Sequence, residues 1–123
     1  MNMKLTKDLH WLNQQVAANW NKARPGGLSV PQLLALDALN ALDGCNQAEL
    51  VAATNVDRST ISDIMRRLAT QGVVKRQRTK EDARCYAIRF TASGQKLFVE
   101  QRAEFVKVEK TMLGAAKALA ASW

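Results

Sequence analysis

The chain has 123 residues, enough for one domain with a modest core. Apolar residues make up 47% of the sequence and charged residues 24%, a composition typical of a folded protein and not of a disordered chain. The formal net charge is +7. Because the sequence has no run of about 18 apolar residues and no apolar leader segment, we expect a cytoplasmic protein with no membrane partner.

The first predicted element is a helix over residues 5–22. Proline and two glycines at 25–27 end it, because none of them continues a helix without cost. Trp11 falls off the apolar stripe of this helix, so it is either simply exposed or a contact for a partner. The stripe itself has spacings of three and four, which place it on one side of a helix: Leu5, Leu9, Leu12, Val16 and Trp20.

Two further helices are expected before residue 55. The second helix starts after Ser29, a favoured N-cap residue, and has Pro31 in its first turn. Its buried side is predicted to be Leu33, Leu36, Leu39 and Leu42. The stretch "DGCN" at 43–46 is a turn, and a short third helix over 47–54 directs Leu50 and Ala53 inward.

A fourth helix is predicted over residues 58–71, between the N-cap Asp57 and the stop signal Gly72. Asn55 precedes it and tolerates the left-handed conformation that a tight turn between two helices requires. The core side of this helix has apolar residues at i, i+3, i+4 and i+7: Ile61, Ile64, Met65 and Leu68.

A hairpin of two strands follows, over 73–78 and 85–90, and residues 79–84 form its tip. On the second strand, Tyr86, Ile88 and Phe90 alternate on one side. Thr91 then caps a last helix over 91–122. Its apolar residues repeat every seven positions in two rows: Phe98, Phe105, Met112 and Leu119, and beside them Val99, Val106, Leu113 and Ala120.

This last helix is too long for a compact domain of this size. At about 1.5 Å per residue it reaches about 45 Å, and its two apolar rows exceed what a lone helix hides against a small domain. An intramolecular hairpin with the first helix is one alternative. We favour packing of both helices against a second subunit, through Leu5, Leu9, Leu12, Val16, Trp20, Phe98, Phe105, Met112 and Leu119.

Basic charge is concentrated in the hairpin. Residues 28–56 contain three acidic residues and no Lys or Arg, whereas residues 73–90 contain six basic and two acidic residues. Such a local basic patch is an electrostatic footprint for a polyanion, and a generally basic surface would not show this clustering.

Metal-ligating and nucleophilic residues are few and scattered. Cys45 and Cys85 lie 40 residues apart without a CxxC pair, and His10 is the one histidine. No carboxylate cluster suits a metal, and no nucleophile has a recognisable base, so we predict no metal, no cofactor, no catalytic residue and no enzyme activity. The simpler interpretation of the cysteines is two reduced thiols. The alternative is an oxidant-sensing pair, since basic neighbours favour the thiolate of Cys85.

A short helix, a three-residue turn, a second helix and a basic hairpin together form a winged helix-turn-helix. With Gln47 as position 1, the apolar anchors fall at positions 4, 10, 15 and 18, where the two helices clamp each other: Leu50, Val56, Ile61 and Ile64. The predicted fold class is therefore mainly α with a small β-hairpin. A single domain, 1–123, has a winged helix-turn-helix core at 28–90 between N- and C-terminal dimerisation helices at 5–22 and 91–122.

The outward face of the 58–71 helix has hydroxyls near its start and arginines further along. At about 100° per residue, Ser59, Asp63, Arg66 and Thr70 lie opposite the apolar stripe. Short polar side chains at the start of a helix in the DNA major groove reach base edges, and arginines reach phosphates or guanine.

Three separated motifs keep the spacing of a known family. "DRSTIS" and "RRLATQGVV" begin and end the 58–71 helix, and "DAR" at 82–84 is followed by an aliphatic residue, an apolar residue and T-x-x-G. The last motif comprises Asp82, Arg84, Ile88, Phe90, Thr91 and Gly94. Over residues 28–98 the sequence resembles the MarR family of bacterial transcription regulators.

The resemblance implies a homodimeric regulator, expected to be a repressor, whose recognition helices enter successive major grooves of a pseudo-palindromic operator. Arg84 at the wing tip would reach into the minor groove, and Asp82 would orient the arginines of the tip. A small-molecule effector is a further implied partner, for which the sequence indicates no residues. The residues expected to contact double-stranded DNA are Arg58, Ser59, Thr60, Ser62, Asp63, Arg66, Arg67, Lys75, Arg76, Arg78, Lys80, Asp82 and Arg84.

Asp63 stands where many members of this family have a basic residue. It either pairs with Arg66 and Arg67, at i+3 and i+4, or accepts a hydrogen bond from cytosine N4. As a whole, the alternative function to DNA binding is a winged-helix module whose basic face binds an acidic protein partner.

Overall fold

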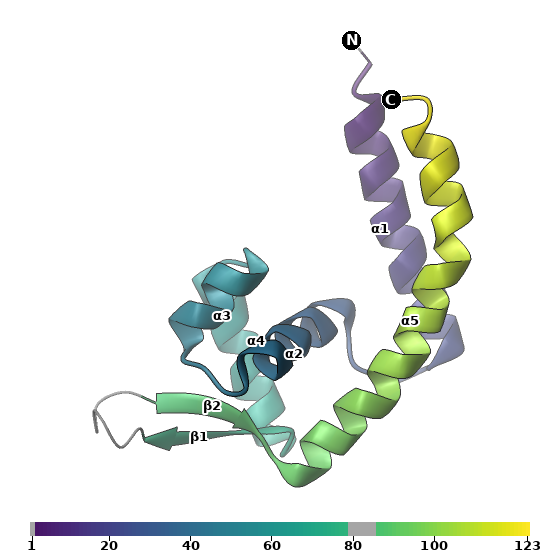
Figure 1. The fold of residues 1–123 in the computed structure, drawn as a ribbon. Helices are drawn as coiled ribbons and strands as arrows, with labels where there is room; N and C mark the ends of the chain where they lie inside the picture. Colours follow the sequence, from purple (N-terminus) through teal and green to yellow (C-terminus); the bar gives the residue numbers. More distant parts are fainter. Residues whose placement is uncertain (1, 79–85) are drawn as a thin grey trace. The chain divides into compact units, whose positions relative to one another are not determined.

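The computed structural model describes residues 2–78 and 86–123. In these residues the elements follow in the order α1 (Lys4–Ala23), α2 (Val30–Leu42), α3 (Gln47–Thr54), α4 (Arg58–Thr70), β1 (Val74–Arg78), β2 (Tyr86–Phe90) and α5 (Ala92–Ala120) (Figure 1). The predicted fold class, mainly α with a small antiparallel hairpin, is confirmed. The chain forms two compact units, residues 29–100 and residues 1–28 with 101–123, and α5 contributes to both.

The core of the 29–100 unit is built by α2, α3 and α4. The side chains at its centre are each 7% exposed or less: Leu33, Leu36, Leu39, Leu50, Ile61, Ile64, Met65 and Leu68. The prediction for Leu42 is wrong, since this side chain is 41% exposed. A spacing of three drifts by about 60° per step along a helix, so that Leu42 lies about 180° around α2 from Leu33.

The prediction for Ala53 is wrong as well, because Ala53 is exposed while Leu50 is fully buried. The two residues are three positions apart on α3, which again separates them by about 60° around the helix axis. The helix α3 has only eight residues, and Leu50 is its buried residue.

The hairpin is extended by a third segment of backbone. Strand β1 pairs antiparallel with β2, with Arg76 opposite Ile88 and Arg78 opposite Tyr86. On the other side of β2, Cys45 and Ile88 exchange backbone hydrogen bonds, with N···O distances of 3.2 and 2.6 Å. Ile88 is accordingly 2% exposed, whereas Tyr86, on the same side of the strand, is 45% exposed near the tip.

Thr91 and Gly94 explain the T-x-x-G part of the wing motif. The Thr91 hydroxyl accepts from the Gly94 N–H at 2.9 Å, as predicted for a cap of α5, and donates to the Gly72 carbonyl at 2.6 Å. A Cβ on Gly94 would lie 1.9 Å from the Val73 carbonyl oxygen. Glycine is therefore required where the start of α5 meets the residues that lead into β1.

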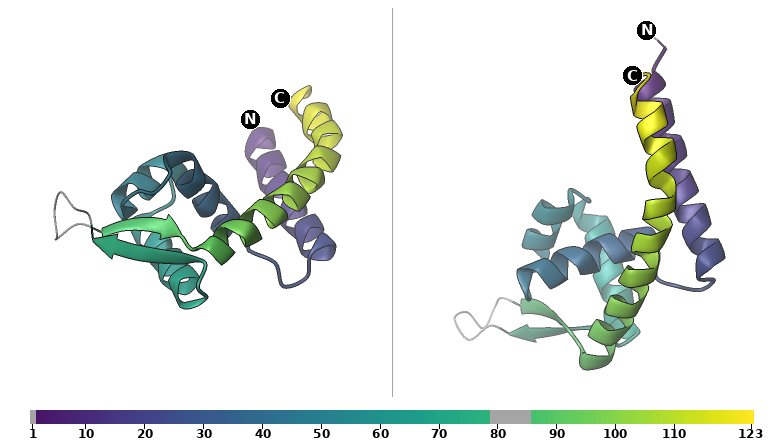
Figure 2. Two further views of the ribbon diagram at one scale, coloured as in Figure 1. Left: turned by 60° about the horizontal axis from the view of Figure 1, so that its bottom comes forward. Right: turned by 45° about the vertical axis from the view of Figure 1, so that its right-hand side comes forward.

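In the other unit, α1 and the C-terminal part of α5 lie side by side and antiparallel (Figures 1 and 2). The ring of Trp20 packs edge-on against Phe105, with the centroids 5.4 Å apart. Buried Gln101 accepts from the Leu28 N–H at 2.7 Å, and the Trp20 indole donates to the Leu28 carbonyl at 2.7 Å. The intramolecular hairpin, which the sequence left as the alternative, is therefore present within one chain.

This pairing leaves much of the apolar surface of α1 and α5 uncovered. Of the α1 stripe only Trp20 is buried. Leu5, Leu9 and Leu113 are each about half exposed, at 49%, 51% and 53%, and Trp11 is 44% exposed. None of the helices in the described part of the chain is long and apolar enough to cross a membrane.

Candidate nucleic-acid interface

The turn between α3 and α4 is fixed by local signals. Asn46 and Glu49 form a reciprocal cap at the start of α3, in which each side chain accepts from the other residue's N–H, at 2.8 and 3.1 Å. Asn55 ends α3 in the left-handed conformation, with φ 55° and ψ 20°, as predicted. Asp57 then caps α4, so that three residues reverse the chain between the two helices.

The two sides of α4 differ as predicted. Ile61, Ile64, Met65 and Leu68 are buried, while the side chains of Arg66 and Arg67 are 71% and 68% exposed. Ser59 and Thr60 are exposed, and Ser62 is half-buried. The helix therefore presents its hydroxyls and arginines on the side that the core leaves free.

Three groups at the start of α4 converge on the Asp57 carboxylate. The Ser59 hydroxyl lies 2.5 Å from Oδ2, the Thr60 hydroxyl 2.7 Å from Oδ1, and the Thr60 N–H donates to Oδ2 at 3.1 Å. These hydrogen bonds, that of Ser59 first, lower the pKa of Asp57 to about 2. The carboxylate is consequently ionised at neutral pH.

Asp63 lies between the two arginines of α4. It forms an ion pair with Arg66, and its Oδ2 lies 3.1 Å from Nε of Arg67. The hydrogen bond from Arg66 is the main cause of a pKa for Asp63 below its ordinary value. The paired arrangement, one of the two alternatives for Asp63, is therefore present in the structure.

The strand β1 supplies a row of exposed basic side chains. Val74 is buried, while Lys75, Arg76 and Arg78 are exposed. Nε of Arg78 lies 3.3 Å from the Tyr86 hydroxyl, and the guanidinium carbon lies 5.7 Å from the centre of the Tyr86 ring. The tip residues Lys80, Asp82 and Arg84 lie outside the described residues.

Two residues around the hairpin were not predicted to matter. Tyr86 supports Arg78, and the strand register, which places them opposite each other, could have revealed it. Arg89 donates from Nη1 to the Asp43 carbonyl at 3.2 Å, and its guanidinium covers Gly44 so closely that a Cβ there would lie 2.9 Å from Nη1. No local sequence signal marks that contact, because the two partners are 46 residues apart.

Cys45 is buried, at 4% exposed. Burial, with a smaller effect of the Glu49 charge, raises the pKa of its thiol to about 11. The thiol is therefore protonated at neutral pH, which favours the reduced, unreactive interpretation for this cysteine. Cys85 lies outside the described residues. Within the described ranges, no group of three His, Cys, Asp or Glu residues could hold a metal ion.

Comparison with known proteins identifies this scaffold. Residues 26–84 match the sequence model of the MarR family, which covers α2, α3, α4 and β1. Over this span the chain is similar to the MarR family. The resemblance found in the motifs is thereby confirmed, and with it a DNA-binding transcriptional regulator.

Relatives with known sequence or structure agree with this assignment to the MarR family. The transcriptional regulator HosA of Escherichia coli O157:H7 is 29% identical over 94 residues, which are 76% of this chain and 69% of HosA. The PcaV transcriptional regulator from Streptomyces coelicolor, solved in complex with its natural ligand, is 25% identical with a TM-score of 0.79 over 87% of this chain and 76% of PcaV.

A mutant of MarR from E. coli, solved in complex with operator DNA, has the same fold as this chain. Its TM-score is 0.75 and its identity 18%, over 96% of this chain and 91% of the MarR chain.

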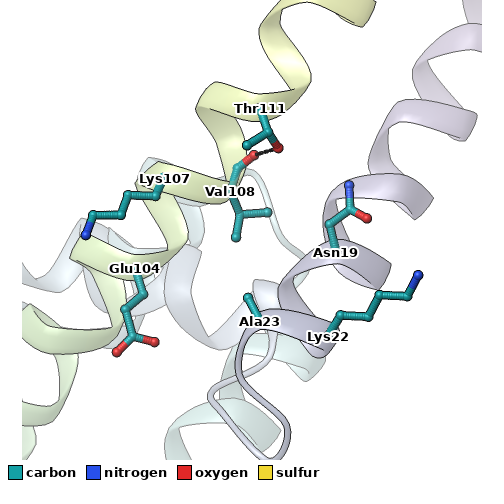
Figure 3. Close-up of a pocket in the computed structure, with 7 residues that line it drawn as sticks. All are labelled: Asn19, Lys22, Ala23, Glu104, Lys107, Val108 and Thr111. Atoms are coloured by element: carbon teal, nitrogen blue, oxygen red, sulfur yellow. Dashed lines mark hydrogen bonds between the residues drawn. The ribbon is translucent and has the colours of Figure 1, made fainter.

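The unit formed by α1 and the C-terminal part of α5 contains an open groove (Figure 3). Its volume is about 570 Å³, and Val108 and Asn19 are directed into the space between the helices. Lys22 and Lys107 extend away from it on opposite sides (Figure 3). The remaining lining residues are Ala23, Glu104 and Thr111.

Proposed function

We propose that this MarR-family regulator acts as a homodimer in the cytoplasm and represses transcription by binding a pseudo-palindromic operator. In this proposal α4 lies in the major groove and the wing tip, residues 79–84, in the minor groove. The observation that carries it is the free face of α4, where two strongly exposed arginines lie opposite a fully buried apolar side. The operator complex of a protein with the same fold supports it.

The proposed contacts divide into two kinds. Ser59, Thr60 and Ser62, with Asp63 beside them, are placed to reach base edges. Arg66 and Arg67 further along α4, and the basic row on β1, are placed to reach phosphates or guanine. The other proposed DNA contacts are Arg58, Lys75, Arg76, Arg78, Lys80, Asp82 and Arg84.

Binding to DNA is tested by titrating the protein with selected and random duplexes over a salt series. We expect a steep fall of log K with log salt, about 0.9 for each phosphate contacted, and a clear preference for one sequence. Arg66→Ala should lower the affinity and flatten this dependence, whereas Lys110→Ala, at an exposed site on α5, should do neither. Weak binding that is indifferent to sequence at every salt concentration would instead favour the module that binds an acidic protein.

The homodimer is supported by the apolar surface that the α1–α5 pair leaves uncovered. Leu5, Leu9 and Leu113 remain about half exposed, although they belong to apolar rows that run along both helices. A second copy would remove this surface from water, at about 25 cal/mol for each Å² of apolar area buried. Of the predicted interface residues, Trp20, Phe98 and Phe105 are buried within the chain, at 3%, 1% and 9% exposed. The surface offered to a partner is therefore formed by the others: Leu5, Leu9, Leu12, Val16, Met112 and Leu119.

The dimer is tested by sedimentation of Leu9→Glu at low micromolar concentration. We expect the variant to sediment as a monomer, because two carboxylates would be buried at the interface without partners. Leu34→Glu is the matched control, since Leu34 is 52% exposed on α2, outside the proposed interface. A Leu9→Glu protein that stays dimeric would contradict the assignment of α1 to the interface.

A small-molecule effector completes the proposal. It is supported by PcaV, which was solved with its natural ligand, and by the groove between α1 and α5. A compound that binds the protein without operator raises its thermal midpoint. If the compound binds this conformation more tightly than the operator-bound one, it should also weaken binding to the operator. A compound that stabilises the protein without any effect on operator affinity would count against this role.

A further inference from the structure

The start of α4 has a hydrogen-bonding arrangement that a simple helix cap does not need. One accepted bond from the Thr60 N–H satisfies the cap. The Asp57 carboxylate also binds both neighbouring hydroxyls, those of Ser59 and Thr60, at 2.5 and 2.7 Å. All three residues are exposed, so water could have served these hydroxyls equally well.

The direction of these two bonds follows from the ionised state of Asp57. An ionised carboxylate only accepts hydrogen bonds, so each hydroxyl must donate its own proton to Asp57. A hydroxyl has one proton and two acceptor lone pairs. Once the proton is directed to Asp57, Ser59 and Thr60 present only lone pairs to any group that approaches the start of α4.

This polarity determines which groups on DNA the two hydroxyls can bind. Phosphate oxygens are acceptors, and so are O6 and N7 of guanine and O4 of thymine in the major groove. The donors in that groove are the amino groups on N4 of cytosine and N6 of adenine. Hydroxyls fixed as acceptors therefore favour an amino group and do not bind phosphate.

We propose that Asp57 is a specificity-determining residue, which fixes Ser59 and Thr60 as hydrogen-bond acceptors and thereby selects cytosine or adenine under the start of α4. Asp57 itself acts as a positioning residue and does not touch the base. This inference rests on the proposed function, in which α4 enters the major groove.

The substitution Asp57→Asn changes the polarity while keeping the cap. Asparagine is as good an N-cap as aspartate, since its amide oxygen accepts from the Thr60 N–H. Its NH2 group, however, donates to a hydroxyl, so that one of the two hydroxyls turns its proton outward. The matched control is Asp63→Asn, which removes one carboxylate from the same helix and leaves the Asp57 cluster intact.

The experiment selects bound sequences from randomised duplexes for the wild type, Asp57→Asn and Asp63→Asn. Thermal midpoints measured beside the selections show that each variant is folded. For the wild type we expect about a tenfold preference for an amino-bearing base at one position of each half-site. In Asp57→Asn this preference should disappear or shift towards guanine or thymine, while the other positions keep theirs.

A second pair of variants, Ser59→Ala and Thr60→Val, identifies the position, because each removes an acceptor without changing Asp57. We expect at least one of them to lose the preference at the same base pair. These variants also serve if Asp57→Asn fails to fold.

The outcomes are distinguishable. If Asp57→Asn tightens binding to all sequences equally, Asp57 acts only through its charge and the inference is wrong. If it weakens binding to all sequences equally, Asp57 is only a cap, and the inference is again wrong. Unchanged selections for both hydroxyl variants would overturn it as well. A wild type without any sequence preference would refute the proposed function itself.

Discussion

Replacing Asp63 by asparagine tests whether this carboxylate restrains the arginines of α4 or reads a base. Asp63 pairs with both Arg66 and Arg67. To bind phosphate, an arginine must give up this partner, and the negative charge of Asp63 must approach the backbone of the DNA. Asp63→Asn removes both obstacles, because an amide has nearly the same shape and no charge.

The expected effect of Asp63→Asn on the affinity for DNA follows from the salt dependence of binding. If each copy gains one phosphate contact, a dimer gains two, and the slope of log K against log salt becomes steeper by about 1.8. Between 50 and 200 mM salt, a fourfold change, this amounts to about a twelvefold larger loss of affinity for the variant than for the wild type. At low salt the variant should bind all DNA sequences more tightly.

The assay is a titration of the preferred operator and of a random duplex at four salt concentrations. Glu109→Gln is the control, because it removes one negative charge at an exposed site of α5, outside the winged core. If the slope of Asp63→Asn equals that of the wild type, the arginines are not restrained by Asp63. If the preference at one C·G pair is lost while the slope stays the same, Asp63 reads cytosine.

Three further predictions concern stability and reactivity. Gly94→Ala should lower the free energy of unfolding in urea by about 3 kcal/mol, because its Cβ would overlap the Val73 carbonyl, whereas Gly114→Ala in the same helix has open space and should be neutral or stabilising; equal effects would refute the close contact. The pKa of Asp57 is about 2 in the folded protein, below its ordinary value, so its contribution to stability is fully present above about pH 4 and is lost as the pH falls towards 2. The thermal midpoint of Asp57→Asn should therefore approach that of the wild type over this range, and a gap that stays constant would disprove the cause. Cys45, with a thiol pKa of about 11, should react slowly with iodoacetamide at pH 8 in the folded protein and fast in urea, as followed by mass spectrometry; fast labelling of the folded protein would contradict its burial.

The helix-turn-helix could be predicted from the sequence because its signals are local. Asn55 in the left-handed conformation, the cap at Asp57 and the apolar spacing of α4 each act within a few residues. The cap of α5 is local as well, because the Thr91 hydroxyl accepts from the N–H of Gly94, three residues further along the chain. The error at Leu42 has a local origin too, since a spacing of three was extended over nine residues of a helix with 3.6 residues per turn.

Contacts between residues far apart in the chain could not be predicted in the same way. The contact between Trp20 and Phe105 shows that the first and last helices pack against each other within one chain. The apolar periodicity alone is equally compatible with helices that pack only against a second subunit. Arg89 over Gly44 depends on the bridge between Cys45 and Ile88, which joins segments that no pattern connects. The direction of a hydrogen bond cannot be read from a sequence either. The sequence shows that hydroxyl residues follow Asp57, but it does not show which group donates the proton.

Two acidic residues, Asp57 at the cap of α4 and Asp63 within α4, are paired with other side chains of the same helix. The Asp57 carboxylate accepts hydrogen bonds from two hydroxyls, and Asp63 forms ion pairs with two arginines. In the proposed function each arrangement lowers the affinity for DNA in general, because phosphate is an acceptor and carries negative charge. A regulator competes against a very large excess of non-specific sites, so the ratio of specific to non-specific binding matters more than affinity alone. A lower affinity for DNA in general therefore favours selection of the operator, provided that contacts to the correct bases replace what Asp57 and Asp63 hold in the free protein.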